Sequence, residues 1–145
     1  MPRLRWKASA HNRCANTLGG TQRGVGLVFS AWYALIVGAL MIVQWAFFLA
    51  TGQVPELQSE PYRIAFHLVG EAVTAIALIG AGIGLLRRRP WGRSVALIAY
   101  GLLVYTMIVS PGYFAQSGDW LFVGMFTLLL AMAGVAIVRL VRTSE

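Results

Sequence analysis

The sequence contains few charged residues and a single cysteine. Only 12% of its 145 residues are Asp, Glu, Lys or Arg, about half the fraction usual in soluble domains. So little charge cannot cover a globule of this size with polar surface, which excludes an ordinary soluble protein. The lone Cys14 excludes an internal disulfide.

Long uncharged stretches dominate the rest of the chain. A transmembrane helix needs about 20 predominantly apolar residues, and inside a bilayer the helix satisfies its own backbone hydrogen bonds. The sequence therefore predicts an all-α integral membrane protein with four transmembrane helices. The predicted helices occupy residues 25–50, 64–86, 94–115 and 120–138.

These helices divide the chain into a basic N-terminal segment (1–24), a four-helix domain (25–141) and a short tail (142–145). Short loops make consecutive helices antiparallel neighbours, which favours a four-helix bundle. Pro111 lies within the third predicted helix. Either a proline-kinked continuation toward Gln116 or a bent segment at the outer interface is expected there.

Basic residues are concentrated on one side of the predicted membrane. Five Lys or Arg precede the first helix, four lie between residues 87 and 93, two follow the fourth helix, and only Arg63 falls on the other side. This bias predicts a plasma-membrane protein with both termini in the cytoplasm. An outer aromatic belt is predicted at Trp45, Phe47, Phe48, Tyr62, Tyr113 and Trp120.

The net charge of +7 does not indicate a nucleic-acid-binding protein, because the basic residues flank apolar segments instead of lining one face. The bilayer and its anionic phospholipids are the predicted partners, since basic residues near a membrane surface are attracted to anionic head groups. The predicted head-group contacts are Arg87, Arg88, Arg89 and Arg93.

Small residues recur at helical spacing in several predicted helices. Helices in lipid pack through small residues that let their backbones approach, so these stripes are predicted to face neighbouring helices. In the first helix the stripe is Gly26, Ser30, Ala34 and Gly38. In the fourth helix it is Gly124, Thr127, Ala131 and Gly134.

The second predicted helix contains a carboxylate, Glu71, and a histidine, His67, and no other predicted helix contains either type. The two are four residues apart and share one face of the helix. A carboxylate at this depth is costly unless it is protonated or paired. Polar residues of other predicted helices that lie at a similar depth in the membrane are the remaining candidate site residues. They are Gln44, Tyr105, Thr106 and Ser110.

Three interpretations of this polar group remain open. It is a hydrogen-bonded network that fixes helix register, a site for a small polar ligand, quinone or lipid head group, or a proton relay. A metal site is not predicted, because His-x3-Glu supplies two ligands and a metal needs more. The chain has no phosphate-binding loop and no Ser-His-Asp set, so no cofactor and no catalytic residue is predicted.

The segment Val69-Gly70-Glu71, followed by Gly80-x-Gly82-x-Gly84-Leu85-Leu86, a basic turn and another apolar run, resembles the small four-helix membrane proteins grouped as DoxX-like. The resemblance implies the same topology and, for some members, a link to quinone-coupled redox complexes. It implies no catalytic residue.

The leading functional prediction is a non-catalytic accessory or assembly subunit, with complex subunits or a second copy of the chain as partners. The alternative is a small-molecule or proton-binding membrane protein that uses His67 and Glu71. A second alternative is a lipid- or quinone-modifying enzyme, which would need a second catalytic group such as Tyr105 near Glu71.

Overall fold

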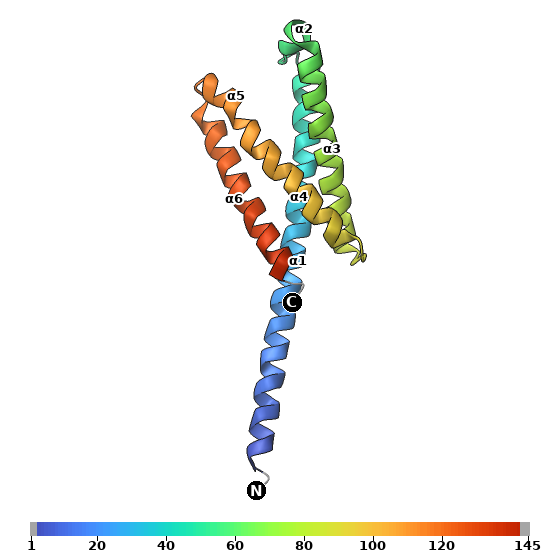
Figure 1. Ribbon diagram of the computed structural model, residues 1–145, viewed down its shortest axis with the longest axis vertical. Coiled ribbons are helices and arrows are strands. Elements are labelled where there is room, and N and C mark those ends of the chain that lie inside the picture. The colour runs from blue at the N-terminus through green and yellow to red at the C-terminus, as the bar shows by residue number, and fades with distance from the viewer. Residues whose placement is uncertain (1–2, 143–145) are drawn as a thin grey trace.

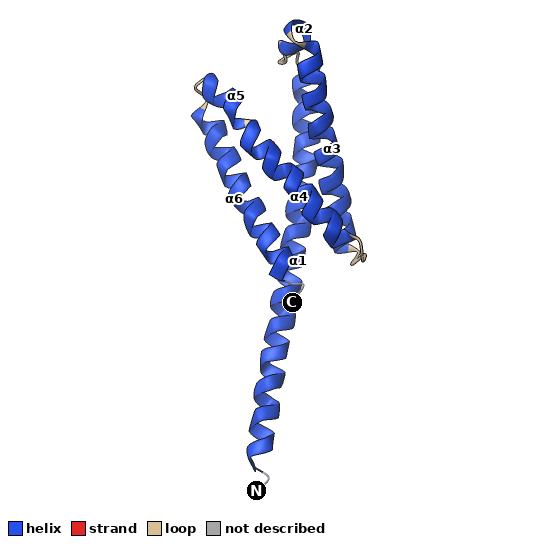
Figure 2. Cartoon of the chain, viewed as in Figure 1, coloured by secondary structure: helices blue, strands red, loops and turns tan. Residues whose placement is uncertain are grey.

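A computed structural model describes the backbone of residues 3–142 and the side chains of residues 24–142. Within these residues the chain is all-helical, as predicted, and contains no strand (Figures 1 and 2). Apart from Gly24 and Arg142, the side chains of the basic N-terminal segment and of the tail lie outside the described residues. The helices are α1 (Arg3–Ala50), α2 (Glu56–Ser59), α3 (Pro61–Leu86), α4 (Gly92–Val109), α5 (Pro111–Gln116) and α6 (Trp120–Arg142).

Four helical stretches are long and apolar enough to cross a membrane. The shortest has 23 residues, which at 1.5 Å per residue covers about 34 Å and exceeds the roughly 30 Å of bilayer hydrocarbon. The prediction of four such helices is confirmed. The stretches are Gly24–Ala50, Pro61–Leu86, Gly92–Gln116 and Trp120–Arg142.

The third stretch contains Pro111 and joins α4 to α5. Ser110, between the two helices, has helical dihedral angles (φ −62°, ψ −37°), and its N–H donates to the carbonyl of Thr106. Pro111 occupies the first position of α5, where its missing N–H and its fixed φ are tolerated. The chain therefore continues helically toward Gln116, which was one of the two expected arrangements.

The long helices contact one another in the order α1–α3–α4–α6, and α6 also contacts α1. Figure 1 shows the chain reversing direction between successive long helices, and shows α1 and α3 diverging from α5 and α6 toward one end. We call that end the acidic end, because it carries Glu56, Glu60 and Asp119. The opposite, basic end carries Arg87, Arg88, Arg89, Arg93, Arg139 and Arg142.

Close backbone approach joins α1 to α3. A Cβ atom on Gly38 of α1 would lie 2.9 Å from the carbonyl oxygen of Ala75 in α3. A Cβ on Gly82 of α3 would lie 2.8 Å from the carbonyl oxygen of Ala31 in α1. Gly26, Ser30, Ala34 and Gly38 are all buried, so the predicted interface stripe of the first helix is confirmed.

The corresponding prediction for the fourth helix is wrong. Gly124, Thr127, Ala131 and Gly134 of α6 are all exposed. The helix instead packs through a different face, formed by Phe126, Ala133, Ala136 and Leu140. Alanine is small enough for close packing, and an outward-facing glycine meets no penalty from lipid, so spacing alone did not distinguish the two faces.

Buried hydroxyl groups bind backbone carbonyls across three helices. Tyr100 of α4 donates to the carbonyl of Ser30 in α1 (2.5 Å). The Ser30 hydroxyl donates to the carbonyl of Gly26 in its own helix (3.0 Å) and also lies 3.3 Å from the carbonyl of Ala136 in α6. Tyr33 of α1 donates to the carbonyl of Leu129 in α6 (2.6 Å), and its ring stacks on that of Tyr100. Each such bond between membrane helices contributes on the order of 0.6 kcal/mol, and together they fix the register of α1, α4 and α6.

Three helices end in the same hydrogen-bond pattern, in which the residue two positions beyond the helix has positive φ. In α1 and α5 that residue is Gly52 (φ 66°) or Gly118 (φ 80°). In α3 it is Arg88 (φ 50°), whose N–H donates to the carbonyl of Leu85 (3.1 Å). The N–H of Arg89 donates to the carbonyl of Gly84 (2.9 Å), which completes a Schellman motif.

An Arg88→Gly substitution is expected to stabilise the protein by about 1 kcal/mol, since a left-handed conformation costs an L-residue with a Cβ roughly that much. The side chain of Arg88 is exposed, so its burial does not offset this conformational cost. Thermal unfolding in mild detergent measures the change. Gly118→Ala, which introduces a Cβ at the equivalent position of α5, is the matched control and should destabilise the protein by a similar amount. Destabilisation by Arg88→Gly would contradict this account.

Candidate functional site

The candidate site is built around Glu71, which lies on the face of α3 that packs inside the molecule. Its residue is 7% exposed, and atom Oε1 is buried without a hydrogen-bond partner. The nearest basic group is Nε2 of His67, 4.0 Å from Oε1 and one helical turn nearer the acidic end. A buried carboxyl oxygen without a partner is uncommon and energetically costly.

The imidazole of His67 lies between Glu71 and the exterior. Its side chain is 38% exposed, and residue 67 is six residues from the start of α3, about 9 Å along the helix axis. His67 thus contacts both the buried carboxyl group and the surroundings near the helix end.

Trp45 of α1 completes the wall of the site. Its ring meets the His67 ring edge-on, with 5.7 Å between centroids and 72° between the ring planes. The Trp45 side chain also neighbours the carboxyl group of Glu71, and an indole can only donate a hydrogen bond. The sequence assigned Trp45 to the outer aromatic belt. Only the pairing of α1 with α3 shows that it also faces His67.

The other predicted site residues are placed differently. Thr106 is buried in α4, but its hydroxyl donates to the carbonyl of Leu103 in its own helix (2.9 Å). Tyr105, next to it, is 67% exposed. Gln44 on α1 and Ser110 at the α4–α5 junction are half-buried. The pair that the structure clearly brings together is therefore His67 and Glu71.

The predicted head-group contacts lie at the basic end. Arg87, Arg88 and Arg89 are exposed on the turn between α3 and α4. Arg93 is half-buried, and its guanidinium donates to the carbonyl of Val141 near the end of α6 (3.1 Å). Arg93 thus satisfies one of the backbone acceptors that a helix leaves free at its C-terminus.

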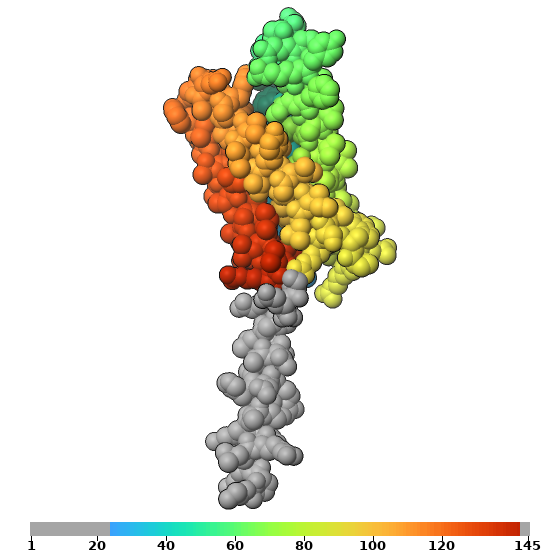
Figure 3. Space-filling model, viewed as in Figure 1, coloured from blue at the N-terminus to red at the C-terminus, as the bar shows by residue number. Residues whose placement is uncertain are grey.

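The surface of the acidic end has a recess where α3 and α5 diverge. In the space-filling view a recess separates α3 from α5, and α1 lies deeper within it (Figure 3). Tyr113 of α5 lies against the carboxylate of Glu56 in α2, which connects the two walls at this end. Residues from both sides of the divergence therefore approach each other beyond the level of His67.

The chemistry available to the site is that of one carboxyl group and one imidazole. Among the described side chains no group of three His, Cys, Asp or Glu residues is placed to hold a metal ion. A carboxyl oxygen that lacks a donor, such as Oε1 of Glu71, can take up a proton or accept a hydrogen bond from a cationic ligand. A neutral imidazole has one donor and one acceptor nitrogen, so it can pass a proton between that group and the exterior.

Within the described residues, these features define an all-helical chain with four helices long and apolar enough to cross a membrane, and with a buried carboxyl group beside a partly exposed imidazole. The chain belongs to the family described as a domain of unknown function, DUF8058, whose model matches residues 27–145. No curated protein matches it, and no solved structure matches it.

Proposed function

We propose that this protein binds a proton or a small protonated ligand at Glu71, within a bundle of four antiparallel transmembrane helices. In this proposal the protein lies in the plasma membrane, and both termini and the basic end face the cytoplasm. Eleven of the twelve Lys and Arg residues lie toward that side. The site then lies in the outer half of the bundle, and His67 connects it to the outer surface.

The observation that carries the proposal is the unpartnered Oε1 of Glu71. A carboxyl group whose role was to fix helix register would be expected to have its hydrogen bonds satisfied, as those of Tyr33 and Tyr100 are. Polar residues inside a membrane that are left incompletely satisfied are expensive and mark functional positions. A proton, or the N–H of a cationic ligand, would supply the missing partner.

The test is whether Glu71 titrates as a buried carboxyl group. Infrared difference spectra of the protein in lipid nanodiscs, recorded across pH, should contain one carboxyl band with the character of an unsolvated group. Glu71→Gln should remove that band, because the amide has the same shape and no titrating proton. Ethylammonium should shift the band in the wild-type protein if the site also accepts an amine.

Glu60→Gln is the matched control. Glu60 is exposed and pairs with Arg63, so its replacement should leave the buried carboxyl band intact. Identical spectra for wild-type and Glu71→Gln proteins at every pH would overturn the proposal.

The second candidate is an accessory subunit of a membrane complex, which would include the quinone-linked complexes that the sequence resemblance suggests. The exposed small residues of α6 favour it, since Gly124 and Thr127 leave a helix face on which another helix could pack. This role predicts that joint replacement of His67 and Glu71 by apolar residues leaves complex assembly unchanged. The enzyme alternative has less support, because Tyr105, its proposed second group, is largely exposed whereas Glu71 is buried.

A further inference from the structure

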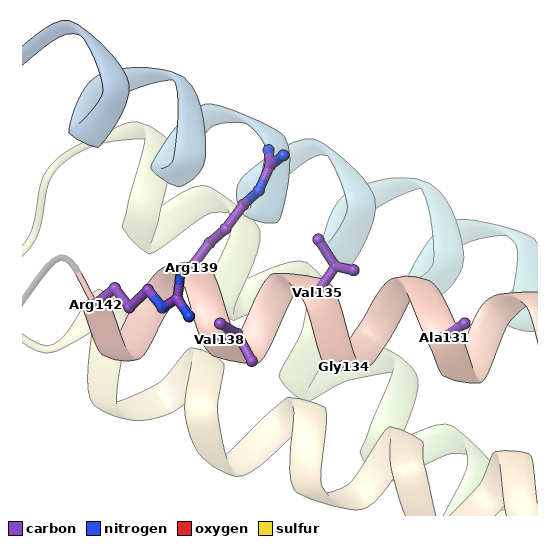
Figure 4. A pocket seen from close by; sticks show the side chains of 6 residues that line it. All are labelled: Ala131, Gly134, Val135, Val138, Arg139 and Arg142. Atoms are coloured by element: carbon purple, nitrogen blue, oxygen red, sulfur yellow. The ribbon is translucent and has the colours of Figure 1, made fainter. Parts of the chain in front are cut away.

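A groove runs along α6 at the basic end of the molecule, far along the helix from the acidic end. It has a volume of about 490 Å³ and is lined by Ala131, Gly134, Val135, Val138, Arg139 and Arg142. Its walls are apolar for two helical turns and end at two arginines. Figure 4 shows Arg139, Val135 and Ala131 directed toward α1, and Arg142 lying at the end of the helix.

Glycine and alanine create the groove. A Cβ atom added to Gly134 would meet no other atom within 4 Å, so the space above this residue is open. Ala131 and Gly134 are both exposed and leave room beside the larger Val135 and Val138. From residue 131 to residue 142 the groove follows about 16 Å of helix, which is a suitable length for part of an acyl chain.

The charged end of the groove is held in position by α1. The aliphatic stem of Arg139 lies over Gly26, where an added Cβ would meet the Arg139 Cβ at 3.6 Å. The Arg139 guanidinium lies over the ring of Phe29, 4.8 Å from its centroid. A side chain that is already ordered loses little conformational entropy when a ligand binds. Arg93, bonded to the carbonyl of Val141, adds a third guanidinium near the same helix end.

We propose that this groove binds one anionic phospholipid, whose phosphate contacts Arg139 and Arg142 and whose acyl chain lies along Ala131 to Val138. Guanidinium groups bind phosphate oxygens through paired hydrogen bonds. The apolar part of the groove lies within the membrane-crossing stretch Trp120–Arg142, and the arginines lie at its end, which is the level of the lipid head groups. The site is separate from His67 and Glu71 and does not depend on their function.

Charge favours a lipid over a second copy of the chain. Among the described side chains, the carboxylates are Glu56, Glu60 and Asp119 at the acidic end and Glu71 within α3. A parallel copy would therefore bring arginines against arginines at the basic end and offer them no carboxylate. An anionic lipid supplies both the negative charge and the apolar chain.

Native mass spectrometry in mild detergent, with phosphatidylglycerol and phosphatidylcholine added separately, tests the proposal. The wild-type protein should retain one phosphatidylglycerol per chain and bind phosphatidylcholine more weakly. The Arg139→Gln/Arg142→Gln variant should bind phosphatidylglycerol roughly 25-fold more weakly, the change expected when two arginines near the membrane surface no longer attract the phosphate. The Arg63→Gln variant removes a positive charge from the acidic end and should retain the bound lipid.

Gly134→Leu tests the apolar half without changing charge. The leucine side chain fills the groove and should displace the lipid, while Gly124→Leu, at an equally open position of α6, should not. If both arginine variants lost lipid equally, the binding would be diffuse attraction to the charged surface, and the proposal would be wrong. Lipid retention by Gly134→Leu, or dissociation of a dimer by that variant, would also overturn the proposal.

Discussion

The Glu71→Met variant is expected to be more stable than the wild-type protein by about 1–3 kcal/mol, the usual cost of a buried polar group that lacks a hydrogen-bond partner. Oε1 of Glu71 is buried without a hydrogen-bond partner, and the His67 nitrogen, 4.0 Å away, is beyond ordinary hydrogen-bond distance. Methionine has a similar length and no group that needs a partner, and its flexibility lets it fill an irregular space. The same variant should lose the titrating carboxyl group.

Unfolding of the purified protein by heat or by titration with a denaturing detergent measures this change. Glu60→Met is the control at an exposed position of the same region, where substitutions usually change stability by less than about 0.5 kcal/mol. A clear loss of stability in Glu71→Met would show that the carboxyl group supports the fold. In that case the site would be structural, and the proposed ligand or proton role would lose its main support.

The Gly92→Ala variant is expected to destabilise the protein by about 3 kcal/mol, at the upper end of the usual range for overpacking. The added Cβ would lie 2.6 Å from the carbonyl carbon of Gly84, 2.8 Å from its oxygen and 2.9 Å from the nitrogen of Leu85. All three are backbone atoms of α3 and cannot rotate away. The start of α4 would have to move away from the end of α3, and the α3–α4 turn would open.

Gly101→Ala provides the matched comparison in the same helix. A Cβ at Gly101 meets nothing within 4 Å, and alanine is a better helix former than glycine by about 1 kcal/mol. This substitution should therefore stabilise the protein in the same unfolding measurement. Similar effects of the two substitutions would mean that α3 and α4 do not approach as closely as Gly84 and Gly92 indicate.

The sequence predicted the helices well and their contacts only in part. Charge and hydropathy alone were sufficient to locate four membrane-length helices. The stripe through Ser30 and Gly38 was placed correctly at an interface, whereas the stripe through Gly124 and Gly134 was not. In water an exposed apolar face would be penalised, but in lipid both faces of α6 are acceptable, so its hydrophobic pattern contains little information about its orientation.

The candidate site was also predicted in part. A spacing of four residues correctly placed His67 beside Glu71, because both lie on one helix. To predict which residues of other helices join the site, the rotation of each helix about its axis is needed as well as the depth of each residue. Thr106 had a suitable depth, yet its hydroxyl is bound within α4, and Trp45 had been assigned a purely interfacial role. Rotation about the helix axis is set by packing between helices, which no local pattern determines.

The hydroxyl contacts between helices have a consequence for the family's evolution. Tyr33 and Tyr100 donate to main-chain carbonyls of other helices, and every amino acid at the accepting position supplies that carbonyl. Substitutions at Leu129 or Ser30 can therefore preserve the bond if the new side chain fits. We expect each donor to be retained across homologues as an isolated position, without a co-varying partner. The covariation signal among homologues should then be stronger at the glycine contacts between α1 and α3 than at the hydrogen bonds that connect α1 to α4 and α6.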